Sequence, residues 1–249
     1  SMPPMPKSDK IWFNGELVPW DQARIHVLAH VVHYGSSVFE GIRCYHTQKG
    51  PAVFRLEEHI DRLFDSAKIY RMEYSLSQEQ MENAVLDTIR ANQYRACYIR
   101  PLIYRGYDTL GVNPLPCPVE ATIMLWEWGA YLGEDGLVNG VNITISPWKR
   151  ISLEAFPPSA KASGQYLNSM LAVQEARNRG YDEALLLNQD GFIAEGSGQN
   201  IFIVKNGKVF TNGESASILM GVTRKTVIQL CRDLGFEIKI GDLTQEMVI

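Results

Sequence analysis

The spacing of apolar side chains predicts a mixture of helices and strands in the first half of the chain. Residues 55–72 repeat apolar positions at the three- and four-residue spacing of an amphipathic helix. Residues 77–93 begin with a Ser-x-x-Gln capping box and continue as a second helix. Residues 96–106 and 119–128 are rich in strand-forming side chains, and an Asn-Gly pair within residues 11–18 indicates a β-hairpin.

The second half of the chain shows the same alternation of elements. Residues 165–180 are typical of a helix that ends on glycine, and residues 220–235 predict another helix. Residues 183–196 and 199–211 each contain two apolar runs joined by an Asp-Gly or Asn-Gly pair, which predicts two hairpins. A strand follows at residues 236–240, so the predicted fold class is mixed α/β (α+β).

A change of composition divides the chain into two predicted domains. Residues 131–140 belong to a glycine-rich stretch with few core-forming side chains. We interpret them as the connection between an N-terminal domain at 1–130 and a C-terminal domain at 141–249. The last predicted element, a short helix after Asp242, would end on a bare apolar face at Ile249. We therefore expect the natural protein to continue and the C-terminal domain to be incomplete in this sequence.

Composition narrows the partners and the compartment. The 249 residues are 45% hydrophobic and 21% charged, with a net charge of −4 and no block of Lys and Arg. These features argue against nucleic acid and anionic membranes as partners, and no apolar run reaches the length of a membrane span. The four cysteines are scattered without a CxxC pair, which indicates buried, reduced thiols in a cytoplasmic protein.

Lys161 is isolated in a way that suggests chemistry. It is the single charged residue between Ala155 and Gln174, and its neighbours are small. An environment without other charges implies a low local dielectric, which lowers the pKa of an amine and makes it nucleophilic. Such an amine suits a Schiff base with a carbonyl compound. A solvated surface lysine is the plain alternative.

Two further positions in the second half could bind a charged ligand. Glu195 ends an apolar strand and precedes a Gly-Ser-Gly turn, where a carboxylate could pair with a protonated ring nitrogen or, more plainly, with solvent. Gly221 precedes a predicted helix, so the first N–H groups of that helix and the Thr223 hydroxyl could hold an anion. A plain helix start is the better explanation for that position taken alone.

The first half contains a predicted pocket for a carboxylate. Tyr98 and Arg100 lie two residues apart on one strand, so both side chains point to the same face, where a phenol and a guanidinium suit a carboxylate. Residues 34–43 combine aromatic, small and basic side chains and predict a pocket wall. Trp128 and Tyr131 could add an apolar lining, although core packing is the simpler explanation for each aromatic alone.

Two other patterns in the first half favour plain structural roles. His26, His30 and His33 have the spacing of one helix face and could ligate a metal. No HExxH motif, acidic cluster or paired cysteine supports a metal site, and none is predicted. Arg62 follows Glu58 by four residues within the predicted helix, which is the usual spacing of a surface ion pair.

Together these residues resemble the branched-chain amino acid aminotransferases, in the class IV aminotransferase family of pyridoxal phosphate enzymes with fold type IV. The resemblance extends from the region of Lys10 to the last residue. It rests on a series of ordered motifs: IWFNGELV, HYGSSVFEGIRCY, HIDRLFDSAKIYRM, YIRPLI, GVNP, WGAYLG, SAKASGQYLNS, EGSGQNIF and GVTR.

The resemblance implies a small N-terminal α/β domain, a larger C-terminal pseudo-barrel domain and a pyridoxal 5′-phosphate site between them. It implies transamination of leucine, isoleucine and valine with 2-oxoglutarate or glutamate by a ping-pong mechanism, in a homodimeric or larger enzyme of amino-acid biosynthesis. The pair Tyr98 and Arg100 favours this activity over D-amino acid aminotransferases and aminodeoxychorismate lyases, which share the fold. A non-catalytic or truncated family member is the alternative.

The resemblance also implies a role for each site residue. Lys161 forms the aldimine with the cofactor and moves the proton between the substrate Cα and the cofactor. Glu195 bonds the pyridine nitrogen, and Tyr166 bonds the phenolic oxygen. Tyr98 helps to bind the α-carboxylate, and Arg100 receives the side-chain carboxylate of glutamate. The remaining implied assignments are Arg62, Val222 and Thr223 for the phosphate, Tyr34, Phe39, Gly41, Trp128 and Tyr131 for the substrate pocket, and Leu110 and Val112 for contact with the site of the partner subunit.

The sequence departs from the family pattern near the phosphate helix. Asn212, Gly213 and Met220 stand where the family usually has prolines, and because proline fixes φ we expect this loop to be less preorganised. The later Gly-Thr-Ala-rich turn of the family, which supplies phosphate and α-carboxylate contacts, is absent from the sequence. If the molecule ends at Ile249, weak cofactor binding and poor activity are expected.

Overall fold

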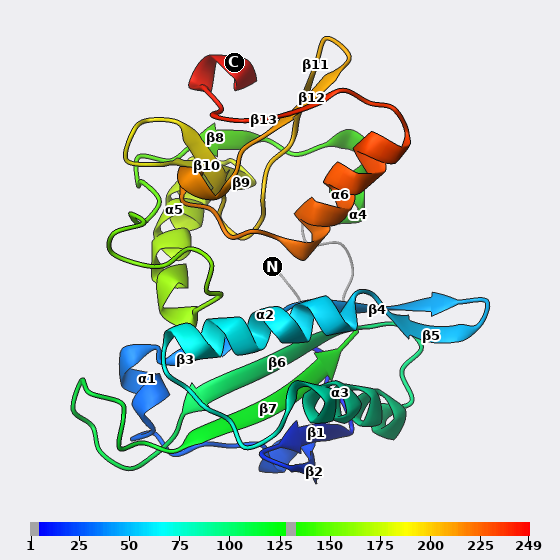
Figure 1. Cartoon of the computed structure of the whole chain (residues 1–249), viewed down its shortest axis with the longest axis vertical. Helices are drawn as coiled ribbons and strands as arrows, with labels where there is room; N and C mark the ends of the chain where they lie inside the picture. Colours follow the sequence, from blue (N-terminus) through cyan, green and yellow to red (C-terminus); the bar gives the residue numbers. More distant parts are fainter. Residues whose placement is uncertain (1–4, 128–132) are drawn as a thin grey trace. The chain divides into compact units, whose positions relative to one another are not determined.

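The computed structural model describes residues 5–127 and 133–249, which form two compact units (Figure 1). The described residues up to 127 make the first unit together with Ala160–Gly164. Residues 133–159 and 165–249 make the second unit. Among the described residues, none of the helices combines the length and the apolar character that a membrane span requires.

The first unit is built on a seven-stranded antiparallel sheet. The strand order is β2-β1-β7-β6-β4-β5, and β3 pairs with β6 outside this path. The predicted hairpin is confirmed as β1 and β2, whose turn residues Asn14 and Gly15 both have positive φ. The seven strands are β1 (Lys10–Phe13), β2 (Glu16–Pro19), β3 (Ser37–Phe39), β4 (Ile42–Thr47), β5 (Gly50–Val53), β6 (Cys97–Arg105) and β7 (Val119–Trp126).

Two helices pack on this sheet and complete its core. The predicted amphipathic helices are confirmed as α2 (Leu56–Ile69) and α3 (Gln78–Asn92). The predicted capping box is present: the Ser77 hydroxyl accepts from the Gln80 N–H at 3.2 Å, and the Gln80 side chain accepts from the Ser77 N–H at 2.8 Å. The apolar faces of both helices are buried against the strands. The fully buried core side chains include Ile60, Leu63, Met81, Ile99 and Leu125.

The segment that carries Lys161 belongs to the first unit because it lies beside β3. The Phe39 N–H donates to the Lys161 carbonyl at 3.1 Å, and Val38 forms an isolated β-bridge with Ala162. This pairing joins residues that are far apart in the sequence, and no local pattern indicates it. It fixes the backbone on which the isolated lysine stands.

The second unit contains two three-stranded sheets, with orders β10-β9-β8 and β11-β12-β13. The two predicted hairpins are confirmed as β9–β10 and β11–β12, and the last predicted strand is β13, which runs parallel to β12. The stretch interpreted as a connection contains a short helix, α4, that buries no residue. The elements are α4 (Glu134–Asn139), β8 (Ile143–Ile145), α5 (Tyr166–Asn178), β9 (Glu183–Leu187), β10 (Ile193–Gly196), β11 (Ile203–Lys205), β12 (Lys208–Thr211), α6 (Val222–Asp233) and β13 (Ile238–Ile240).

The last residues of the sequence pack against the second unit. Leu243 is buried, and its carbonyl accepts from the Ile193 N–H at 2.8 Å. A 3₁₀ helix follows at Gln245–Val248, and its Met247 packs on the core cluster that contains both of these residues. The expected bare apolar face is therefore wrong for Met247, whereas Ile249 is exposed.

Candidate active site

Lys161 is half-buried and is held through its backbone. Its N–H donates to the Ser66 hydroxyl at 3.0 Å, while its carbonyl accepts from Phe39. The Lys161 Nζ lies 4.7 Å from the centre of the Phe39 ring, within the range of a cation–π contact. Ala160 and Ala162 on either side are buried. The amine therefore stands beside an aromatic ring, and the plain surface alternative for this lysine does not hold.

The same Phe39 ring also faces Arg100. The Cζ atom of this guanidinium lies near three aromatic ring centres, 4.6 Å from Phe39, 5.3 Å from Tyr98 and 5.7 Å from Trp126. Its Nη2 donates to the Tyr98 hydroxyl at 2.8 Å, which confirms that the two side chains share one face of the strand. The Arg100 Nε is buried without a hydrogen-bond partner. A cation with an unmet buried donor suits an anionic ligand.

Gly41 lies where Tyr98 passes closest to the backbone. A Cβ at this position would lie 2.3 Å from the Tyr98 hydroxyl oxygen, so any other side chain would displace the phenol. The predicted participation of Gly41 in the pocket therefore has a steric basis: its small size allows the phenol to reach Arg100.

Arg62 is held by a buried carboxylate that the sequence did not single out. Its Nε and Nη2 each donate to Glu40 at 2.7 Å, and the His59 Nδ1 lies 2.7 Å from the same carboxylate. Because an ionised carboxylate only accepts, His59 donates here. Burial alone would raise the pKa of Glu40, but the hydrogen bonds from His59 and Arg62 outweigh it and hold that pKa below its ordinary value. The surface pairing expected from the spacing to Glu58 is therefore wrong, since the Arg62 side chain is only 16% exposed.

The long loop between β6 and β7 is attached to α1 (His30–Tyr34). The Tyr34 hydroxyl donates to the Leu110 carbonyl at 2.9 Å, and the His30 Nε2 lies 2.9 Å from the Gly111 carbonyl. The side chains of Leu110 and Val112 are both exposed. The structure thus connects Tyr34 with the two loop residues that the resemblance assigned to a partner subunit.

The three histidines near α1 do not share one helix face, because the helix begins only at His30 and His26 precedes it. The His26 Nδ1 accepts from the Leu28 N–H at 3.0 Å. The His33 Nε2 lies 2.8 Å from the Val27 carbonyl. Across residues 5–127 and 133–249, no three potential metal ligands gather at one point.

Glu195 is a buried carboxylate on β10 in the second unit. Its Oε1 lies 3.2 Å from the Arg150 Nε without the alignment of a hydrogen bond, which makes this contact an ion pair. Its Oε2 accepts from the Asn200 Nδ2 at 3.1 Å and from the Leu219 N–H at 3.3 Å. A cation and two N–H donors together favour the ionised form of a buried carboxylate. Arg150 and Asn200 are partners that the sequence did not assign.

The N-terminus of α6 offers backbone N–H groups to an anion. Its N-cap, Gly221, supplies no side-chain hydrogen bond, and the first turn contains no acidic residue. Val222 is buried and Thr223 is exposed in that turn. The positive end of the helix dipole therefore has no anionic partner within its own first turn. Tyr166, the first residue of α5, is half-buried in the same unit.

Asn212, which replaces a family proline, does not loosen its loop in the way expected. It is buried, and its Nδ2 donates to the carbonyls of Ile193 and Ala194, each at 2.7 Å. Its own carbonyl accepts from the Arg224 Nη2 at 2.7 Å. Asn212 thus ties β10, which carries Glu195, to α6.

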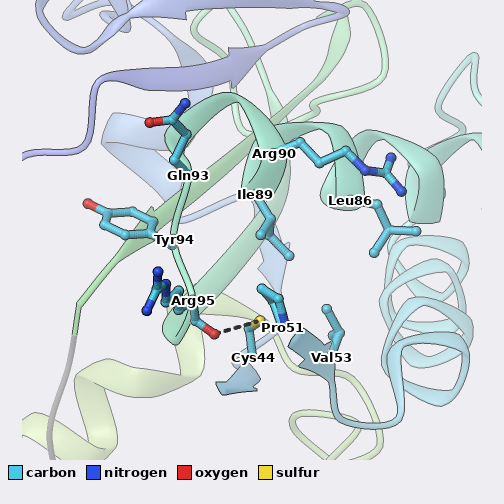
Figure 2. Close-up of a pocket in the computed structure, with 9 residues that line it drawn as sticks. All are labelled: Cys44, Pro51, Val53, Leu86, Ile89, Arg90, Gln93, Tyr94 and Arg95. Carbon is cyan, nitrogen blue, oxygen red and sulfur yellow. Dashed lines mark hydrogen bonds between the residues drawn. The ribbon is translucent and has the colours of Figure 1, made fainter. Parts of the chain in front are cut away.

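A cavity of about 360 Å³ in the first unit is lined by other residues (Figure 2). It lies between the β4–β5 hairpin and the C-terminal end of α3, and none of the residues predicted for the active site lines it. In its wall the Cys44 thiol donates to the Arg95 carbonyl at 3.9 Å. Burial raises the pKa of Cys44, and it raises that of Cys97, the cross-strand neighbour of Cys44, to about 12. Both cysteines are therefore protonated, unreactive thiols, in agreement with the prediction of buried reduced cysteines. Trp128 and Tyr131 lie outside the described residues.

Comparison with known proteins identifies the family. Residues 37–248 match the model of the amino-transferase class IV family. The branched-chain-amino-acid aminotransferase of Salmonella typhimurium is 47% identical over 241 residues, which cover 96% of this chain and 78% of that protein. The crystal structure of the Escherichia coli branched-chain amino acid aminotransferase has a TM-score of 0.94 at 47% identity, over 96% of this chain and 79% of that chain. The branched-chain amino acid aminotransferase of Thermobaculum terrenum, solved in its holo-form with PLP, has a TM-score of 0.89 at 34% identity, over 96% of this chain and 78% of that chain. The predicted mixed α/β fold of type IV is therefore confirmed, and the chain belongs to the class IV aminotransferases and, within them, to the branched-chain-amino-acid aminotransferases.

Proposed function

We propose that this protein is a pyridoxal 5′-phosphate-dependent aminotransferase that acts on leucine, isoleucine and valine, with 2-oxoglutarate as the amino acceptor. The names of its relatives support the reaction class. The single observation that carries the proposal is the arrangement around Phe39, where a lysine amine and a guanidinium contact one aromatic ring. An amine beside a cation that can bind carboxylates is what an amino acid substrate requires.

The side chains present fit the cofactor. Other branched-chain aminotransferases similar to this chain were solved with pyridoxamine 5′-phosphate and with N-(5′-phosphopyridoxyl)-L-glutamate. When bound, pyridoxal phosphate supplies an aldehyde that reacts with amines and a ring that accepts electrons. We assign the phosphate to Arg62 and the start of α6, the ring nitrogen to Glu195 and the phenolic oxygen to Tyr166. The absence of an acid from the first turn of α6, and the ion pair between Glu195 and Arg150, support these assignments.

Lys161 is assigned two tasks. Its amine holds the cofactor between turnovers, and during the reaction it takes the proton from the substrate Cα and returns it to the other side of the transfer. One primary amine can do both, because its neutral form is a nucleophile and also a base. The bonds from its backbone to Ser66 and Phe39 keep the anchor fixed while the side chain moves.

Substrate recognition is assigned to the aromatic residues around Arg100. The rings of Phe39 and Trp126 give an aliphatic side chain an apolar surface, and Arg100 gives glutamate a charge partner on that same surface. Tyr98 is assigned to the α-carboxylate. This combination explains how one pocket could accept both a branched aliphatic and an acidic amino acid.

We further propose a homodimer that works in the cytoplasm. Leu110 and Val112 are 40% and 76% exposed, and apolar side chains on a loop fixed by Tyr34 are suited to burial against a second copy. The four free cysteines fit a reducing compartment. Light scattering on the purified protein should give twice the mass of one chain, and a monomeric mass would contradict the dimer.

Borohydride reduction of protein loaded with pyridoxal phosphate tests the assignment of Lys161. We expect the reduced cofactor on one peptide, the one that contains Lys161, and none on Lys161→Ala. The exposed Lys49 provides a matched control, and Lys49→Ala should label and turn over like the wild type. If Lys161→Ala keeps full turnover, the role of Lys161 is wrong. If the wild type makes no pyridoxamine phosphate from leucine alone, the protein is a non-catalytic member of the family.

A further inference from the structure

Asn200 lies where the carboxylate of Glu195 meets the segment before α6, and it bonds to both. Its Nδ2 donates to the Glu195 Oε2 at 3.1 Å and to the Leu219 carbonyl at 2.8 Å. The Leu219 N–H donates to the same Oε2 at 3.3 Å. Both protons of one amide are therefore used to join the carboxylate to the chain just before the helix.

Gly221 shows how closely this segment surrounds the Asn200 amide. A Cβ on Gly221 would lie 2.3 Å from the Asn200 Oδ1, which is closer than real atoms approach. The φ of Gly221 is −67°, a value that any residue adopts, so backbone conformation does not require glycine here. Space for the Asn200 amide does require it.

We propose that Asn200 is a positioning residue that sets the separation between Glu195 and the N-terminus of α6. This inference rests on the proposed function, in which Glu195 pairs with the ring nitrogen and α6 holds the phosphate. The ring nitrogen and the phosphate are parts of one rigid molecule, so the groups that bind them must keep one separation. Asn200 contacts the carboxylate and the helix start at once, and it can therefore fix that separation before the cofactor arrives.

Asn200 also stabilises the charge of Glu195. The amide donates to Oε2, and Arg150 faces Oε1 at 3.2 Å. The other cation nearby, Arg224, has its side chain bonded to the Asn212 carbonyl. A carboxyl group at position 200 would keep the shape of the amide but would face Glu195 as a second anion. Asn200→Asp therefore separates the donor function of the side chain from its volume.

The affinity of the apo-protein for pyridoxal phosphate, measured by quenching of tryptophan fluorescence, tests the proposal without relying on turnover. Asn200→Ala should weaken binding about tenfold, the effect of losing hydrogen-bond donors to a charged group. Asn200→Asp should weaken it about a hundredfold at pH 8, and the deficit relative to wild type should shrink about tenfold at pH 6, because two facing carboxylates share one proton.

Gln199→Ala is the matched control. It removes a neighbouring amide whose Nε2 bonds to Glu183 at 3.2 Å, on a different carboxylate of the same loop, and its affinity should stay within about twofold of wild type. Thermal melting of each apo-variant reports folding separately. If Asn200→Asp binds as tightly as wild type, or more tightly than Asn200→Ala without dependence on pH, Asn200 merely fills space and the inference fails alone. If wild type does not bind pyridoxal phosphate, the proposed function fails and the inference fails with it.

Discussion

Glu40→Gln should destabilise the first unit by about 3 kcal/mol. Glu40 has no solvent exposure and accepts from Arg62 twice and from His59 once, each bond at 2.7 Å. Glutamine keeps the size of the side chain but turns one accepting oxygen into a donor, so an N–H group of Arg62 or His59 would face another donor. Breaking one partner of a buried ion pair costs about 3–5 kcal/mol. We take the lower end, because the Arg62 side chain keeps 16% exposure and so some solvation.

Urea denaturation of the apo-variants, followed by circular dichroism, measures this effect. At about 2–4 °C per kcal/mol for a chain of this size, the loss also corresponds to a midpoint of thermal unfolding lower by about 6–12 °C. Glu73→Gln is the matched control, since Glu73 is exposed on the loop after α2 and its replacement should change the stability by less than about 0.5 kcal/mol. Equal unfolding midpoints for the two variants would refute the view that the Glu40 carboxylate holds Arg62.

The same network makes a pH prediction whose sign follows from the lowered pKa of Glu40. A carboxyl group with a lower pKa in the folded than in the unfolded state stabilises the protein above its ordinary value of 4.5. That contribution is lost as the pH falls through the folded-state pKa. The difference in unfolding free energy between wild type and Glu40→Gln should therefore be constant near pH 7 and shrink in acid below about pH 4. A difference that grows in acid would show that Glu40 is not held as an ion.

Three other substitutions test the remaining contacts. Arg100→Met should lower kcat/KM for glutamate about a hundredfold, the worth of a lost charge-assisted pair, and change that for leucine less than about threefold; equal losses would contradict the assignment of Arg100 to the side-chain carboxylate. Gly221→Ala should cost about 1–3 kcal/mol in urea denaturation through overpacking on Asn200, and less than about 0.5 kcal/mol in an Asn200→Ala background, so additive costs would exclude that clash. Asn212→Ala should cost about 2 kcal/mol, because two buried carbonyls of β10 lose their donor, and a neutral result in the same assay would show that water replaces the amide.

Local signals account for the elements that the sequence predicted well. The capping box at Ser77 and the Asn-Gly and Asp-Gly turns each act within a few residues, so a short window contains the whole cause. The strands β3 to β5 were missed because β3 and β5 are very short and the mixed composition before them suggested a pocket wall. The helical spacing of His26 and His33 was misleading because α1 begins only at His30. Periodicity alone cannot show where a helix starts when no capping residue marks the place.

The candidate site was predictable where a residue is unusual in its own neighbourhood, and hidden where its role depends on a distant partner. Lys161 is conspicuous because no other charge stands near it in the sequence. Glu40 meets Arg62 across 22 positions, and its surroundings contain nothing that distinguishes it from a surface acid. Asn200 is close to Glu195 in sequence, but its second contact, with Leu219, depends on how the loop before α6 returns. Tertiary pairing of this kind has no periodic signal.

The two supporting networks solve one physical problem in opposite ways. In the first unit a buried carboxylate, Glu40, orients a cation, Arg62, that we assign to a phosphate. In the second unit a cation and an amide, Arg150 and Asn200, orient a carboxylate, Glu195, that we assign to a ring nitrogen. Buried ion pairs are poor devices for stability, since well-packed apolar residues of similar volume often do as well or better. What a buried pair does offer is a fixed direction for one charge, because each remaining hydrogen bond of the ligand group is then limited to the positions that its partner leaves open. Positioning therefore explains both networks better than stability does.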